Sequence, residues 1–250
     1  MTSNDWSRQL ERGKTLFDRL FRVEDDLAGV VEGYQEHGGY VFYHLPKNGG
    51  SSVNSLVQRG KVPVRYSGHE NAVKSHPGSI CIVRCPYDRF VSAYAHSQKK
   101  FSHVPEIAEA LGHGIKTADP LAPVLGNPSD PRHTAATNVV RNRDGHKVDG
   151  KLTSKIWTYE PQATWRPERA DIVLDLSSIA EQWKDLSSSL GWGTHELPHS
   201  NVTHAREKLT RPAAEYIRKT YTKDFPIHRQ AAPACTTCSE IARRLGHSFV

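Results

Sequence analysis

Two stretches of this chain share one order: a short apolar strand, then an irregular loop, then helical spacing. The first strand is expected at 40–45, followed by the loop PKNGGSS at 46–52 and a helix. The second is expected at 79–84, followed by a turn and a helix over 89–100. A third strand at 171–176 also precedes a helical pattern. Strands that alternate with helices favour an α/β fold with a central, mainly parallel sheet flanked by helices.

The length of 250 residues fits one domain that covers 1–250. Apolar spacing predicts helices in an N-terminal segment, 1–38, ahead of a core at 40–228. The stretch 112–150 combines Gly, Pro, Asn, Asp and His with little periodicity, so we expect an irregular insertion there. The tail, 231–250, carries only weak signals.

Charge and composition narrow the classes of partner. Lys plus Arg is 33 and Asp plus Glu is 27, which gives a net charge of +6, but the basic residues are dispersed. Nucleic-acid binders concentrate such residues, so a small anionic ligand is expected and nucleic acid is not. No apolar run approaches the roughly 18 residues of a membrane span, and the first residues are polar. We expect a soluble cytoplasmic protein without a membrane partner.

The number and spacing of the cysteines do not predict a metal site. There are four in the chain, too few for a disulfide scaffold of this length, which favours a reducing compartment. Cys235 and Cys238 form a single CxxC motif near the end of the chain. Such a motif lacks the two further ligands of a zinc site, so no metal is expected.

The loop that follows the first strand has the chemistry of an anion site. Backbone N–H groups at a helix start point outward, and the helix dipole favours negative charge there. Lys47 adds a charge, Gly49 and Gly50 allow close backbone approach, and Ser51 and Ser52 add hydroxyls. A Walker A loop places its lysine after the second glycine, which disfavours an ordinary P-loop nucleotidase. Considered alone, the segment fits a Ser-capped turn equally well.

Residues 43–52, YHLPKNGGSS, resemble the 5′-phosphosulfate loop of sulfotransferases that use 3′-phosphoadenosine 5′-phosphosulfate (PAPS). The similarity is strongest to the carbohydrate branch, whose common form is PKTGGTS. Asn48 replaces the usual Thr and keeps a polar side chain.

Residues 81–94, CIVRCPYDRFVSAY, resemble the 3′-phosphate motif of the same family, usually written VRDPYERFVSAY. Arg84 and Ser92 match the two residues that hold the 3′-phosphate. Arginine offers a bidentate fork for phosphate oxygens, and serine donates a hydroxyl. Cys85 stands where the family has Asp, which leaves a structural contact of that position in doubt.

The resemblance spans roughly 40–228 and implies a single-domain, P-loop-like sulfotransferase fold. It implies transfer of the sulfuryl group of PAPS to a hydroxyl, less readily an amine, of an acceptor, with a glycan as the expected class. The product is 3′,5′-ADP, and the family needs no metal. The residues that the resemblance assigns to the cofactor are Lys47, Asn48, Gly49, Gly50, Ser51, Ser52, Arg84, Ser92, Asn201 and Thr203.

The resemblance also implies the catalytic groups. The positive charge of Lys47 is expected to stabilise the negative charge of the transferring group and of the leaving phosphate. Some carbohydrate sulfotransferases carry their base, a His, between the two phosphate motifs, and His69 lies in the matching interval. Glu70 is the adjacent alternative, because other branches use Glu. Two other classes stay open: a nucleotide-binding module and a kinase-like phosphate enzyme without sulfuryl transfer.

Overall fold

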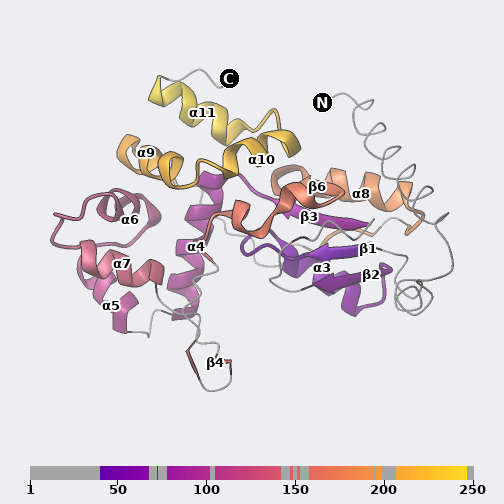
Figure 1. The fold of residues 1–250 in the computed structure, drawn as a ribbon, viewed down its shortest axis with the longest axis horizontal. Coiled ribbons are helices and arrows are strands. Elements are labelled where there is room, and N and C mark those ends of the chain that lie inside the picture. Colours follow the sequence, from indigo (N-terminus) through magenta and orange to yellow (C-terminus); the bar gives the residue numbers. More distant parts are fainter. Residues whose placement is uncertain are drawn as a thin grey trace. The chain divides into compact units, whose positions relative to one another are not determined.

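The computed structural model describes residues 40–67, 72, 78–101, 105–141, 147–148, 151–152, 158–193, 195–198 and 207–246 (Figure 1). The chain divides into two compact units. The first draws on the described residues within Met1–Arg84, Gln162–Val202 and Pro226–Pro233, and the second on those within Cys85–Pro161, Thr203–Phe225 and Ala234–Val250. Across these described residues, no helix is both long and apolar enough to cross a bilayer. That the whole chain works as one domain stays a prediction.

The first unit contains a four-stranded sheet in which every neighbouring pair is parallel, in the order β2-β1-β3-β6. The strands are β1 (Tyr40–Tyr43), β2 (Val64–Ser67), β3 (Ser79–Val83) and β6 (Ile172–Asp175). The two inner strands are buried almost throughout, as expected where helices cover both faces of a parallel sheet. The predicted α/β fold with a parallel sheet is therefore confirmed.

Helices flank this sheet and complete its core. They are α3 (Gly50–Gln58), α8 (Ile179–Ser189) and the 3-10 helices η1 (Gln162–Trp165), η2 (Pro167–Arg169) and η3 (Leu176–Ser178). The buried core joins apolar side chains of the strands to those of α3 and α8, among them Phe42, Val53, Leu56, Ile80, Leu174 and Trp183. The sheet is thus held by the helices that its own strands lead into.

The second unit is built from helices around α4 (Pro86–Phe101). The others are α5 (Pro105–Gly112), α6 (Ala118–Leu125), α7 (His133–Arg141), α9 (Arg211–Thr220) and α11 (Thr236–Leu245), while α10 (Asp224–Ala231) runs from this unit into the first. Within it α9 packs on α4 and α6, and α5 packs on α7. The ring of Phe90 on α4 meets the edges or faces of Tyr159, Tyr216 and Tyr221.

The prediction of an irregular insertion at 112–150 is wrong over most of its described part. The structure has α6 and α7 there, and a short antiparallel pair, β4 (Lys147–Val148) and β5 (Lys151–Leu152). α6 carries Pro123 in its interior, which masks a helical pattern in the sequence. Packing of its buried face against α9 supplies the stability that its intrinsic propensity lacks. The helices expected in 1–38 lie outside the described residues.

Candidate functional site

The Pro46–Ser52 loop connects the end of β1 to the start of α3 in an unusual backbone conformation. Lys47 has φ of 66° and Gly49 has φ of 79°, both in the left-handed region. A non-glycine residue rarely adopts such a φ, and its occurrence is concentrated at functional sites. Gly49 is the N-cap of α3 and provides no side-chain cap, and the N–H of Ser52 in the first turn bonds back to the oxygen of Gly49 at 3.0 Å. This geometry suits an anion bound by backbone amides.

Close packing explains both glycines of the loop. A Cβ atom built on Gly50 would lie 1.9 Å from Cδ2 of His44, and one on Gly49 would lie 2.5 Å from Cδ1 of Leu176. The His44 ring is held in place by a hydrogen bond between its Nδ1 and the hydroxyl of Tyr66. Burial raises the pKa of Tyr66 to about 12, which keeps this hydroxyl protonated at neutral pH. The two glycines are therefore required by the packing of these side chains, and their predicted role in bringing an anion close to the backbone stays a prediction.

Asn48 ties the loop to the neighbouring strand. Its side chain is buried, and its Nδ2 donates to the backbone oxygen of Ile82 at 2.9 Å and to Oε1 of Gln162 at 3.0 Å. The carboxamide of Gln162 in turn bonds to both backbone groups of Arg84. Gln162 Nε2 donates to the backbone oxygen of Arg84 at 2.9 Å, and the backbone N–H of Arg84 donates to Gln162 Oε1 at 3.2 Å. Gln162 is fully buried and was not among the predicted site residues. One amide therefore joins the loop after β1 to the residue that follows β3.

Lys47 and Arg84 lie together at one edge of the sheet. Nη1 of the half-buried Arg84 donates to the backbone oxygen of Lys47 at 3.3 Å. The strand that follows β1 in the sequence, β2, lies on one side of β1, and the later strands β3 and β6 lie on its other side. The order in which strands are added to the sheet therefore reverses between β1 and β3. In open α/β sheets, ligands bind at the carboxyl ends of the strands beside such a reversal. The two cationic residues of the two sequence motifs meet at that position.

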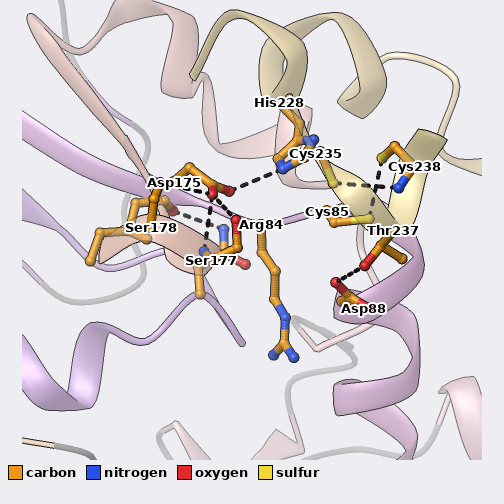
Figure 2. A network of polar contacts seen from close by, with 12 residues as sticks. Arg84, Cys85, Asp88, Asp175, Ser177, Ser178, His228, Cys235, Thr237 and Cys238 are labelled. Atoms are coloured by element: carbon orange, nitrogen blue, oxygen red, sulfur yellow. Dashed lines mark hydrogen bonds and ion pairs between the residues drawn. The ribbon is translucent and has the colours of Figure 1, made fainter. Parts of the chain in front are cut away.

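A second polar network fixes the end of β6 (Figure 2). Asp175 Oδ1 lies 3.0 Å from Nε2 of His228, and both residues are buried. Asp175 Oδ2 accepts hydrogen bonds from the Ser177 N–H and hydroxyl and from the Ser178 hydroxyl. This network holds the start of η3, and with it Leu176, the side chain that contacts Gly49. Figure 2 shows the guanidinium of Arg84 pointing away from Asp175 and His228.

The remaining predicted site residues are placed in part. Ser51 is exposed and Ser52 is half-buried on the first turn of α3, and Ser92 is buried on α4 in the second unit. The predicted base, its alternative and the two later cofactor residues lie outside the described residues: His69, Glu70, Asn201 and Thr203. The structure therefore brings together Lys47, Asn48, the two glycines and Arg84.

Comparison with known proteins adds no relative: no family model, no curated protein and no solved structure matches this chain.

Replacing Gly50 by alanine tests the packing of the loop. The new methyl group would overlap the His44 ring, so we expect the free energy of unfolding to fall by about 1–3 kcal/mol. Denaturant unfolding measures this change. Removing the ring should relieve the overlap, so the same substitution in a His44→Ala background is expected to cost much less.

Gly112→Ala is the matched control for this experiment. Nothing lies within 4 Å of the position that its Cβ atom would take, so its stability should stay near that of the unmodified protein or rise slightly. An equal loss at Gly50 with and without the His44 ring would contradict the packing account.

Proposed function

We propose that this protein transfers the sulfuryl group of PAPS to a hydroxyl of an acceptor, with a glycan as the expected class, and releases 3′,5′-ADP. The observation that carries the proposal is the placement of the Pro46–Ser52 loop beside Arg84. A hydrogen bond from the Arg84 guanidinium to the backbone oxygen of Lys47, together with the Gln162 amide, joins them between β1 and β3 of a parallel sheet. The donors gathered there, which are backbone N–H groups, an ammonium and a guanidinium, suit a ligand with phosphate and sulfate groups.

The 5′-phosphosulfate end is assigned to the loop. The helix dipole at the start of α3 favours negative charge, and Gly49 and Gly50 carry no side chain of their own there. Lys47 supplies a positive charge for the oxygens of the transferring group and of the leaving phosphate. Reactions of this kind depend mainly on positioning and electrostatic stabilisation. Lys47 is therefore the residue on which the rate should depend most among those in the loop.

The 3′-phosphate end is assigned to Arg84. Its guanidinium has five N–H donors in a fork that matches phosphate oxygens, and its backbone is held by Gln162. The resemblance adds Ser92 on α4 and, from the later segment, Asn201 and Thr203. These assignments come from the sequence motifs.

The acceptor proton needs a base. In the proposed step the acceptor oxygen attacks sulfur, the bond from sulfur to the bridging oxygen of the phosphosulfate breaks, and the acceptor proton passes to His69. Support comes from the sheet: Ser67 ends β2 opposite Tyr43 of β1, so the chain leaves β2 at the edge where the loop lies. His69 follows Ser67 by two positions in the sequence, and Glu70 is the alternative.

An acceptor screen tests the proposal. The protein is incubated with labelled PAPS and panels of glycans, lipids and small phenols, and the products are read by mass spectrometry. We expect sulfated product and 3′,5′-ADP in equal amounts. Calorimetric titration with 3′,5′-ADP identifies a binding module, which would bind the nucleotide without turnover. The same acceptors with ATP identify a kinase-like enzyme, which would transfer phosphate. Either of those results, or failure to bind 3′,5′-ADP, would overturn sulfuryl transfer.

A further inference from the structure

Three cysteines from two distant segments of the sequence lie close together in the second unit. Cys85 immediately precedes α4, and Cys235 and Cys238 lie at the start of α11. The Sγ atoms of Cys85 and Cys238 are 3.3 Å apart, and all three sulfur atoms lie within 4.8 Å of one another. Figure 2 shows the side chains converging from the two segments. All three are buried and none is in a disulfide.

The spacing of the sulfur atoms is close to what a tetrahedral metal ion needs. Zinc–thiolate bonds of about 2.3 Å at tetrahedral angles put the sulfur atoms about 3.8 Å apart. The three sulfur atoms already lie near this separation, so small side-chain rotations would complete the geometry. Thiolate ligands select soft ions such as zinc over magnesium or calcium. The cluster therefore has the ligand type and the spacing of a zinc site.

The backbone at the start of α11 presents an N–H donor to the sulfur of Cys235. Cys235 is the N-cap of α11, and its Sγ accepts a hydrogen bond from the N–H of Cys238 at 3.4 Å. The positive end of a helix dipole and a backbone N–H donor both stabilise negative charge on sulfur.

A carboxylate lies beside the motif. Asp88 follows Cys85 by three positions on α4, and its Oδ2 accepts a hydrogen bond at 3.2 Å from the hydroxyl of Thr237, which lies inside the CxxC motif. The group of ligand atoms within 4.8 Å of one another contains the three sulfur atoms and not this carboxylate, so the fourth position of a tetrahedral ion is left to a water molecule. Cys81 is also buried, but its sulfur contacts the backbone oxygen of Pro167 in the first unit.

We propose that Cys85, Cys235 and Cys238 together bind one zinc ion, which joins the start of α11 to the start of α4. On binding, the three thiols lose their protons to solvent and three zinc–sulfur bonds form, with no change of oxidation state. Cys85 supplies one of the two ligands that the CxxC motif lacks in the sequence. The site is separate from the proposed sulfuryl transfer and needs none of its residues.

Zinc titration of the full chain tests this site. Protein that has been reduced and stripped with a chelator is titrated with Zn²⁺ against a chromophoric chelator, and in parallel with Co²⁺. We expect one zinc per chain and the sulfur-to-cobalt charge-transfer absorption of a thiolate site. Cys85→Ser, Cys235→Ser and Cys238→Ser should each weaken zinc binding by more than about tenfold. Cys81→Ala is the matched control and should bind zinc like the unmodified protein.

A second readout covers variants that fold poorly. Ligand binding to the folded state raises its melting temperature, so zinc should raise that of the unmodified protein and of Cys81→Ala. Cys235→Ser keeps a favourable N-cap and is expected to fold, but zinc should not raise its melting temperature. Substoichiometric zinc, unchanged affinity in Cys85→Ser, or a Cys85–Cys238 disulfide that yields no zinc affinity after reduction would overturn the proposal.

Discussion

Lys47→Met is expected to slow PAPS-dependent sulfuryl transfer by about 10²–10³-fold. Methionine keeps most of the length of the side chain but removes the charge that the proposal places on the leaving phosphate. The contact from Arg84 uses the backbone oxygen of Lys47, so it should persist and the loop should keep its shape. Initial rates with an acceptor from the screen measure the effect, and thermal unfolding checks that stability is retained.

Lys61→Met is the control for Lys47→Met. Lys61 is exposed, follows α3 and carries the same charge away from the loop, so its transfer rate should match that of the unmodified protein. Equal losses in both variants would show that the rate follows net charge, which would contradict a local role for Lys47.

His69→Ala is expected to slow transfer by about 10²–10⁴-fold, the usual contribution of a general base. Binding of 3′,5′-ADP should be unchanged, because the proposed base contacts the acceptor and not the nucleotide.

Two further variants separate the base from its neighbours. His113→Ala removes a half-exposed histidine at the end of α5 and should leave the rate unchanged. Glu70→Gln should also be active. An active His69→Ala together with an inactive Glu70→Gln would instead assign the base to Glu70.

The sequence predicted the parts of the fold that local pattern determines. Strands at 40–45, 79–84 and 171–176 appear as β1, β3 and β6, because continuous apolar runs are typical of buried parallel strands. The meeting of Lys47 and Arg84 follows from the same reasoning, since parallel strands have their carboxyl ends at one edge. The four residues of β2 were too short a signal to predict.

The missed contacts join residues that are far apart in the sequence. Asn48 and Gln162 are 114 positions apart, and Cys85 and Cys238 are 153 apart, so no local pattern indicates either pair. α11 is different, because its buried residues recur with helical spacing at Cys238, Ile241, Ala242 and Leu245. That signal lies within 231–250, where only weak signals were noted in the sequence, so this helix could have been predicted.

The carboxamide of Gln162 also has a topological role. It bonds to both backbone groups of Arg84, the last residue before the chain leaves the first unit, and Gln162 is the first residue after the chain returns. The segment between them is thus an excursion whose two ends are fastened to each other. The entropy of closing such a loop grows only slowly with its length. Residues can be added to or lost from the middle of this excursion without changing the strand ends that carry Lys47 and Arg84.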